Sequence, residues 1–469
     1  MPPDLLHSLT SNAWSVFLVV LFFGGSIFVH ELGHFIAARR RGVVVEQFSI
    51  GFGHAIWSHR GKDGVQYRIN WFPFGGYVML PQLADLSSVE GASKLDKGAL
   101  PPVDYVSKVV IFVAGATFNV LFALALACVV WAIGEPESGE FATTRIGYIK
   151  QTLDLQDGSQ APSPALEAGL RPGDLIVAVD GRSVTDWNQV TETIVTGSGR
   201  DSENRPRIVF SIKRGGKPLD VVLRPLLAGS DRLRMVGISP AFVPVVVAAD
   251  PKSPEGRAGF AAGDEVLRLD GTPVLHTLGC FDYLQSHSGQ SVTAVVLRAG
   301  RELSLKIPAH PAKADGSDFG LTLGAETLLV HPSPLVQIGS QIASTFRTFA
   351  SLINPRSDIG LSKLSGPVGI VRMLHSAASV GIGPVILFTI FVNVNLAIFN
   401  LLPIPMLDGG QILFATIGRL RGQALPMKFI VAAQSVFGVL LISAILYVSF
   451  FDIRRWEHDA AAVKVVNDK

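Results

Sequence analysis

The sequence predicts a polytopic α-helical membrane protein with four transmembrane helices and two α+β modules outside the bilayer. Three observations lead to this fold class. Of the 469 residues, 48% are hydrophobic and 17% are charged, a balance between that of soluble proteins and that of pure membrane bundles. Four stretches are apolar enough and long enough to cross a bilayer. Between the second and the third of them, one pattern of residues occurs twice.

The four apolar stretches each have close to the roughly 20 residues that a transmembrane helix needs. The first is preceded by neither a basic leader nor a small-residue cleavage site, so we expect a retained span rather than a signal peptide. The third ends at prolines, which interrupt a helix. The stretches comprise residues 16–38, 109–133, 384–402 and 430–451.

Basic residues predict the orientation of these spans, because loops rich in Lys and Arg stay in the cytoplasm. The segment before the first span has neither residue, whereas the loop 39–108 is rich in both, so we expect this loop in the cytoplasm. Both termini and the long segment 134–383 then face outward. Arg419, Arg421 and Lys428 agree, whereas the basic residues of the C-terminal tail favour the opposite orientation. The basic residues of the first loop are Arg39, Arg40, Arg41, Arg60, Lys62, Arg68, Lys94, Lys97 and Lys108.

The long outward segment contains a repeat. SPALEAGLRPGDLIVAVDG (163–181) matches SPEGRAGFAAGDEVLRLDG (253–271) at an offset of 90, and extending this offset upstream pairs 146–147 with 236–237. In both copies, short β-branched runs alternate with Gly and Asp turns around a short helical stretch. We therefore expect two α+β modules of similar structure. Their expected bounds are 141–228 and 229–312.

The Gly-x-x-x-Gly-Asp run of each copy, followed by Asp-Gly, resembles the PDZ domain in its bacterial arrangement. In PDZ domains a peptide adds as a strand to an open sheet edge, and a loop of backbone amides receives its carboxylate. The alternative is a pair of β-rich spacer domains that bind no ligand. The resemblance places the peptide-receiving loops at Ile146, Gly147 and Tyr148, and at Val236, Gly237 and Ile238.

The remaining segments follow from the spans. Residues 1–133 hold the first two spans and the loop between them. Residues 334–376 begin with an amphipathic pattern and continue with the loop-like SGPVGIV (365–371), which predicts a membrane-surface helix and a loop. Residues 377–452 hold the third and fourth spans, and residues 453–469 form a tail.

The first span contains His30-Glu31-Leu32-Gly33-His34. Two histidines four residues apart on a helix differ by only about 40° in direction and about 6 Å in height, so both imidazoles can bind one zinc ion. Glu31 is placed to act as the general base toward water. The alternative is a chance match, but ionisable side chains inside a span are costly and therefore indicate function.

A catalytic zinc site has a third protein ligand. Asp408 in NLLPIPMLDGG (400–410) is the best candidate, because it follows the third span at a depth similar to that of His30. Pro403 and Pro405 break the helix, and non-helical backbone at that depth must be buried in protein or line a wet cavity. The alternative is an aspartate at a helix end, exposed to the cytoplasm beside a glycine turn.

The tandem modules, HELGH in the first span and NLLPIPMLDGG in a later one together resemble the site-2 protease family of intramembrane zinc metalloproteases. The resemblance covers most of the chain, from about residue 12 to about residue 452. It implies one Zn²⁺ held by His30, His34 and Asp408, with Glu31 as the catalytic acid and base. The substrate-binding residues that it implies are Asn400, Pro403, Pro405, Phe74, Gly75 and Gly76.

The segments 48–57 and 67–80 resemble the membrane-reentrant β-hairpin region of the same family. A helix hides its peptide bonds, so a transmembrane substrate must be unwound before hydrolysis, and an exposed strand edge can hold it extended. The alternative is an ordinary cytoplasmic hairpin. AGATFNV (114–120) matches the second-span pattern around Asn119, but Ala116 stands where the family usually has proline. This departure leaves the loop geometry and the choice of partner open.

The resemblance implies a multi-pass protease of the bacterial inner membrane, with periplasmic PDZ domains and an active site toward the cytoplasm. Its substrate would be a pre-trimmed single-pass membrane protein, such as an anti-sigma factor or a signal-peptide remnant, and the PDZ pair would exclude intact substrates. One alternative is a membrane-anchored PDZ scaffold or sensor with an inactive metal site, in which Glu31 would have no purpose. A metal transporter would need further intramembrane carboxylates. The net charge of +2 and the lack of a basic tract give no sign of a nucleic-acid partner.

Overall fold

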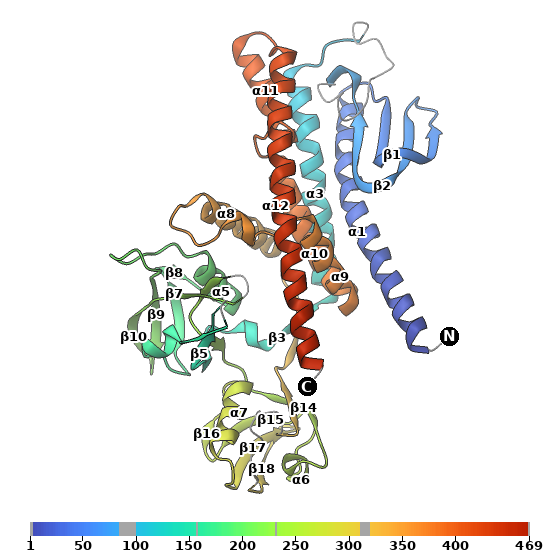
Figure 1. Ribbon diagram of the computed structural model, residues 1–469. Coiled ribbons are helices and arrows are strands. Elements are labelled where there is room, and N and C mark those ends of the chain that lie inside the picture. Colours follow the sequence, from blue (N-terminus) through green and yellow to red (C-terminus); the bar gives the residue numbers. More distant parts are fainter. Residues whose placement is uncertain (1–2, 84–99, 156–157, 230–231, 310–318, 468–469) are drawn as a thin grey trace. The chain divides into compact units, whose positions relative to one another are not determined.

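The computed structural model describes residues 3–83, 100–155, 158–229, 232–309 and 319–467 (Figure 1). They form two compact units. Unit 1 comprises Met1–Glu135, His331–Phe346 and Ser362–Lys469, and unit 2 comprises Pro136–Val330 and Arg347–Leu361. Lys94 and Lys97, two of the basic residues used to predict orientation, lie outside the described residues.

The described residues of unit 1 contain four helices that are long and apolar enough to cross a membrane, which confirms the predicted number. They are α1 (Pro3–Arg40), α3 (Tyr105–Ile133), α10 (Ile382–Asn400) and α12 (Met427–Asn467). Within α1 and α12, the candidate spans are Val16–Arg40 and Met427–Trp456.

Two helix ends differ from the prediction. Helix α10 ends at Asn400 instead of reaching Leu402. Leu402 directly precedes Pro403, and a residue before a proline disfavours helical backbone. Helix α12 continues to Asn467, so the separate tail predicted at 453–469 is wrong. The residues after Asp452 include good helix formers and no Gly or Pro that would end the helix.

Helices α1 and α3 lie side by side because small residues face each other between them (Figure 1). A side chain at Gly33 of α1 would place its Cβ 2.8 Å from the carbonyl carbon of Ala114 in α3. Further along α3, Ala123 and Ala127 are fully buried and pack with Ile390 and Val394 of α10. Close helix contact through small residues is the usual way in which transmembrane helices associate.

The predicted β-hairpin is confirmed as β1 (Gln47–Arg60) and β2 (Gln66–Met79). Its register is irregular, because residues 47–50 pair both with 66–69 and with 76–79. The two long strands therefore fold into a four-part sheet in which 76–79 form one edge. The hairpin is held to α1 and α3 by an apolar cluster that comprises Ala37, Ala38, Val43, Val45, Phe48, Val65, Val78, Leu80 and Ile111.

Unit 2 contains two β-rich modules with the same internal ion pair. The aspartate of each Gly-Asp motif is buried and pairs with an arginine at the end of a later strand: Asp174 with Arg214, and Asp264 with Arg298. The first module contains β4 (Ile146–Ile149), β7 (Leu175–Val179), β8 (Arg182–Ser183), α5 (Trp187–Thr196), β9 (Ile208–Arg214), β10 (Lys217–Leu223) and β13 (Ile238–Pro240). The second contains β14 (Val245–Ala249), β15 (Glu265–Leu269), β16 (Thr272–Pro273), α7 (Thr277–Ser286), β17 (Val292–Arg298), β18 (Arg301–Ile307) and β19 (Leu321–Gly324).

The two copies align differently upstream of their shared motif than the offset of 90 predicts. The N–H of Ile146 donates to Asp174 O, and the N–H of Val246 donates to Asp264 O. Ile146 therefore corresponds to Val246, an offset of 246 minus 146, or 100, and its predicted pairing with Val236 is wrong. The difference arises from a hairpin in the first module, β5 (Thr152–Asp154) with β6 (Gln160–Pro162), that the described part of the second lacks.

The predicted module boundary at 228–229 is also wrong. Strand β13 pairs with β4, so the first module continues to Pro240. Strand β19 pairs with β14 and closes the second module in the same way, beyond the predicted end at 312, which lies outside the described residues. Consequently Ile146, Gly147 and Tyr148 lie in a paired strand, and the prediction that they form a peptide-receiving loop is wrong.

The segment after the modules forms α8 (Pro334–Ile353) and α9 (Pro367–Val380). The loop predicted at 365–371 is wrong, because α9 begins at Pro367, and proline is well suited to the first position of a helix. Residues 408–421 form α11 (Asp408–Arg421) between α10 and α12. The short elements not yet named are η1 (Pro81–Leu83), β3 (Glu135–Ser138), η3 (Gly139–Ala142), α4 (Pro164–Glu167), β11 (Leu226–Ala228), β12 (Leu233–Met235), α6 (Pro254–Arg257), β20 (Thr327–Val330) and η4 (Leu361–Lys363).

Candidate active site

His30, His34 and Asp408 come together in unit 1. The Nε2 atoms of the two histidines lie 3.1 Å apart. Asp408 Oδ2 lies 3.3 Å from His30 Nε2 and 3.4 Å from His34 Nε2. One potential ligand atom from each residue lies within 4.8 Å of the others. In the structure, the first span and the Asp408 turn therefore come together, as the sequence predicts.

The turn that carries Asp408 is shaped by prolines and glycines. After α10 ends, residues 401–407 form a tight non-helical segment that contains Pro403 and Pro405, and α11 begins at Asp408. A Cβ at Gly409 would lie 2.5 Å from the carbonyl carbon of Leu401, and a Cβ at Gly410 would lie 2.5 Å from that of Ile404. Only glycine fits at these two positions, so the chain can fold back and direct Asp408 toward α1.

Backbone and side-chain contacts orient the two imidazoles. His34 Nδ1 lies 2.8 Å from the carbonyl oxygen of Ile111, which accepts only, so Nδ1 carries the proton and the lone pair of Nε2 faces Asp408. His30 Nδ1 lies 3.1 Å from the side-chain amide of Asn119. The oxygen and nitrogen of a carboxamide exchange places by a half-turn, and Asn119 Oδ1 is otherwise a buried acceptor without a partner. The orientation that satisfies both groups has His30 Nδ1–H donating to Asn119 Oδ1.

These residues fit a zinc ion. Two imidazole nitrogens and one carboxylate oxygen are the donor set of a catalytic zinc site with three protein ligands. With both Nδ1 atoms protonated, the two Nε2 atoms and Asp408 Oδ2 converge as three lone-pair donors with no proton to share. Asp408 Oδ2 is also buried and makes no hydrogen bond within the described part of the chain. A cation at this point would satisfy all three atoms.

Glu31 lies in the same cavity, which has a volume of about 230 Å³. The strand edge comes close to it, since a Cβ at Gly76 would lie 2.8 Å from Glu31 Cγ and 2.9 Å from Ser49 O. Asn400 Nδ2 lies 3.4 Å from His30 Nε2. The other lining residues are Phe52, Tyr77, Val78, Leu80, Leu83, Ile111, Phe112, Met406 and Leu407.

The predicted substrate-binding residues divide into two groups. Asn400 and Gly76 line the cavity together with the ligand candidates. Phe74 and Gly75 precede Gly76 in β2. Pro403 and Pro405 lie in the turn before Asp408, and neither they nor Gly75 line the cavity. In unit 2, Val236 and Gly237 directly precede β13, and Ile238 is its first residue.

Three features of the site had no signal in the sequence. Ile111 contributes only its carbonyl oxygen, which any residue has. Gly115 of α3 lies against both imidazoles, since a Cβ there would be 2.7 Å from Cε1 of His30 and of His34. Tyr77 lines the cavity, and its hydroxyl accepts a hydrogen bond from Gln47 within the sheet.

Comparison with known proteins gives a consistent result over most of the chain. Residues 17–444 match peptidase family M50. The regulator of sigma E protease of Salmonella typhi is 29% identical over 94% of this chain and 99% of its own length. RseP, the regulator of sigma-E protease of Escherichia coli K12, is 29% identical over the same shares. A putative zinc metalloprotease of Vibrio cholerae is 29% identical over 95% of this chain and all of its own. A solved PDZ domain of an SdrC-like protein from Listeria monocytogenes is 20% identical over 17% of this chain and 86% of its own, with a TM-score of 0.16.

Proposed function

The chain belongs to peptidase family M50, and from this membership we propose how this intramembrane zinc metalloprotease works and what it cuts. We propose that it hydrolyses a peptide bond in or near the apolar segment of a single-pass membrane protein. The observation that carries the proposal is the convergence of His30, His34 and Asp408, beside Glu31, in one cavity between helices of transmembrane length.

In this mechanism His30, His34 and Asp408 would hold the zinc ion. The chemistry that bound zinc supplies is Lewis acidity, which polarises a carbonyl group and makes water acidic. The Glu31 carboxylate accepts a proton from the attacking water and returns it to the nitrogen of the leaving amine. Ile111 O and Asn119 keep the two imidazoles in the required tautomer.

The substrate is held as an added strand. Residues 76–79 pair on one side with 47–50, and no other described strand pairs with them. Gly76, Tyr77 and Val78 also line the cavity, so a peptide that extends this edge would pass the catalytic residues in the extended form that hydrolysis needs. Asn400 is placed to contact the backbone of that peptide.

We place the active site toward the cytoplasm of a bacterial inner membrane. Helix α1 ends with Arg39 and Arg40, and α11 ends with Arg419 and Arg421. Since basic residues stay in the cytoplasm, these ends mark the inner side. His30 precedes Arg40 by ten residues, or about 15 Å along the helix. Unit 2 then lies in the periplasm.

Each β-rich module of unit 2 is proposed to be a PDZ domain. Gly237 O accepts the N–H of Lys150 after β4, and Gly320 O accepts the N–H of Asp250 after β14. Val236 and Gly237, which lead into Ile238 at the first position of β13, are therefore the proposed peptide-receiving loop of the first module, and the corresponding loop of the second contains Gly320. The pair would exclude substrates that still carry a bulky outward domain; the alternative is a spacer role without a ligand.

The names of the relatives support a role in sigma-E signalling. The proposed substrate is an anti-sigma factor whose outward domain another protease has already trimmed, and signal-peptide remnants are a second candidate class. The competing function, a PDZ scaffold with an inactive metal site, predicts no cleavage at all.

The test uses the purified full chain in phospholipid vesicles with a tagged, pre-trimmed single-pass protein. Mass spectrometry of the fragments is expected to locate one cut within or beside the apolar segment. Glu31→Gln is expected to lower the rate at least about 100-fold while zinc content is unchanged, and Glu137→Gln, outside the cavity, serves as the matched control. Equal cleavage by Glu31→Gln would refute the mechanism, and an uncut substrate with zinc-loaded wild type would support the scaffold.

A further inference from the structure

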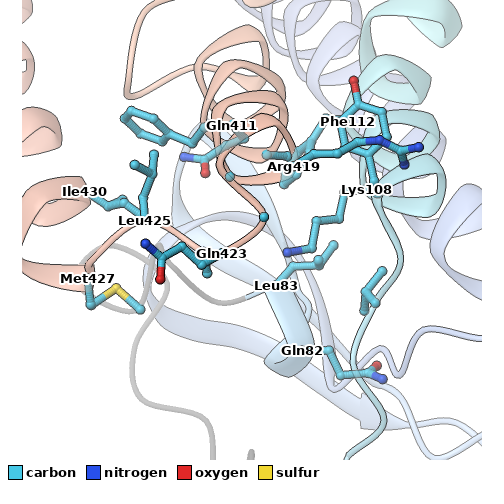
Figure 2. A pocket seen from close by; sticks show the side chains of 17 residues that line it. Gln82, Leu83, Lys108, Phe112, Gln411, Arg419, Gln423, Leu425, Met427 and Ile430 are labelled. Carbon is cyan, nitrogen blue, oxygen red and sulfur yellow. The ribbon is translucent and has the colours of Figure 1, made fainter.

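A second and larger cavity in unit 1 takes no part in the proposed reaction. It has a volume of about 540 Å³ and lies between the first turns of α3 and α12 and one face of α11 (Figure 2). Leu83 and Phe112 border both this cavity and the catalytic one, but none of the candidate zinc ligands lines it. The lining residues are Gln82, Leu83, Val103, Tyr105, Lys108, Phe112, Gln411, Phe414, Ala415, Gly418, Arg419, Gly422, Gln423, Ala424, Leu425, Met427 and Ile430.

The polar side of this cavity is positively charged. Among the described residues, its lining includes Lys108 and Arg419 but no Asp or Glu. Neither cation forms an ion pair with a carboxylate in the described ranges. Asp104, one turn before Lys108, accepts the N–H of Ser107 as the cap of α3 and does not line the cavity. The two charges are therefore available to an anion.

The two cations are held differently. Figure 2 shows the Lys108 ammonium pointing into the cavity toward Leu83 and Gln423. The Arg419 guanidinium lies over the ring of Tyr105, 4.8 Å from its centroid. The Tyr105 hydroxyl in turn lies 3.1 Å from Thr416 Oγ1 of α11, which fixes the ring beneath the guanidinium. The Gln423 side chain adds a neutral amide donor.

The rest of the lining is apolar, and its location matches the membrane surface. Phe112, Phe414, Leu425 and Ile430 form walls beside the charged side chains. Helices α3 and α12 both begin at this cavity, so it lies where two transmembrane helices enter the bilayer. Phosphate groups of lipids occupy that depth, and basic pockets between transmembrane helices on the cytoplasmic side bind lipid headgroups.

We propose that this cavity binds the headgroup of an acidic phospholipid, with the phosphate at the Lys108 ammonium and with Arg419 adding positive charge to the lining. Charge-assisted hydrogen bonds to the phosphate and contact of the adjoining acyl groups with the apolar walls would both contribute to affinity. Helix α11 begins at Asp408 and contributes Gln411, Phe414 and Arg419 to the lining, so the bound lipid contacts the helix that carries a zinc ligand. The proposal uses the membrane topology given above but does not depend on proteolysis.

The test is native mass spectrometry of the full chain in detergent, titrated with phosphatidylglycerol, with phosphatidylcholine and with inorganic phosphate. Wild type is expected to bind phosphatidylglycerol in preference to phosphatidylcholine. Lys108→Gln with Arg419→Gln is expected to weaken this binding about tenfold or more. The matched control is Arg421→Gln with Lys428→Gln, which removes one charge at the end of α11 and one in the first turn of α12 from residues that do not line the cavity. It should change binding less than about twofold.

The conservative pair Lys108→Arg with Arg419→Lys keeps both charges and is expected to retain binding. This result would show that the double Gln variant loses binding through the lost charges and not through misfolding. Equal weakening in the two double Gln variants would overturn the proposal, because bulk surface charge would then explain the binding. Competition by inorganic phosphate at the same concentration would identify a free-anion site instead. Displacement of the lipid by an acidic peptide would identify a peptide site.

Discussion

Nδ1 of His30 lies 3.1 Å from the side-chain amide of Asn119, which belongs to the neighbouring transmembrane helix α3. Asn119 is fully buried, and its contact leaves Nε2 of His30 free to face Asp408. A residue that does not line the catalytic cavity thus determines which nitrogen of a ligand candidate faces Asp408. Partners of this kind orient metal ligands and raise their affinity.

The first prediction concerns this amide. Asn119→Ala removes the acceptor of the His30 Nδ1 proton, and we expect zinc affinity to fall about 10- to 100-fold. Zinc affinity is measured by competition with a chelator on the purified full chain. Thr117→Ala, an exposed position of the same helix whose hydroxyl donates to Val113 O, is the control and should bind zinc like wild type. Equal affinity in Asn119→Ala would show that the contact does not orient the ligand.

The second prediction concerns the close contact of α1 and α3. A methyl group at Gly115 would lie 2.7 Å from Cε1 of both imidazoles, where no real side-chain carbon fits. Gly115→Ala must therefore displace the histidines or separate the helices, and we expect loss of most zinc binding and a fall in proteolysis of at least about 100-fold.

The control for this prediction is Gly25→Ala. A Cβ at Gly25 in α1 meets no atom within 4 Å, so this substitution adds the same methyl group to a helix without a clash. Thermal unfolding is measured for both variants. A Gly115→Ala protein that retains full zinc content and activity would contradict the packing described for the site.

Some features of the fold were open to prediction because they depend on local sequence. Span length and the spacing of His30 and His34 follow from one helix, and both agree with the structure. For Asp408, the sequence predicted only a depth similar to that of His30. Its direction toward α1 depends on the backbone contacts of Gly409 and Gly410, which no helical periodicity reveals.

Other features depend on contacts between distant segments and could not be predicted. The β-hairpin was recognisable, but its double register follows from how 47–50 are shared between two parts of β2. The offset of the repeat failed upstream because the first module contains an inserted hairpin, whose short strands 152–154 and 160–162 have no pattern that separates them from a loop. The role of the Ile111 carbonyl oxygen could not be predicted either, because every residue has a backbone acceptor.

The third prediction concerns Asp452 near the end of the last span. Its carboxylate accepts the N–H groups of Gly366 at 2.9 Å and Gly369 at 2.8 Å, and it pairs with Arg455 at 2.6 Å. It thus caps the start of α9 from another helix. Asp452→Ala leaves two buried donors and Arg455 without this acceptor, and we expect a loss of about 2–4 kcal/mol in the free energy of unfolding.

Asp452→Asn is the companion variant for this prediction. It keeps one acceptor oxygen but loses the charge, so we expect a smaller loss than in Asp452→Ala. Amide hydrogen exchange in α9 measures the effect locally, and full protection of α9 in Asp452→Ala would contradict the capping role.

The last prediction concerns pH and the joint between the two modules of unit 2. His276 caps α7, since its Nδ1 accepts the N–H of Leu278 at 3.0 Å, and its ring stacks on Tyr148 and contacts Phe242. Burial, aided by the charge of Lys150, lowers the pKa of His276 from 6.5 to about 4. Protonation of Nδ1 would remove the acceptor and break the cap.

The sign of the effect follows from this pKa. Between pH 6.5 and about 4 the unfolded chain binds a proton at His276 and the folded chain does not, so the stability contributed by this residue is present above pH 6.5 and is lost as the pH falls toward 4. We expect the amide protection of α7 (Thr277–Ser286) to fall by about tenfold more than in a non-titrating variant between pH 6.5 and 4.5. His276→Asn is that variant, because asparagine is a good helix cap and carries no proton in this range. Hydrogen exchange is measured on both full-length proteins at each pH, so that the intrinsic pH dependence of exchange cancels in the comparison. Identical protection of α7 in the two proteins at every pH would exclude His276 as the titrating group.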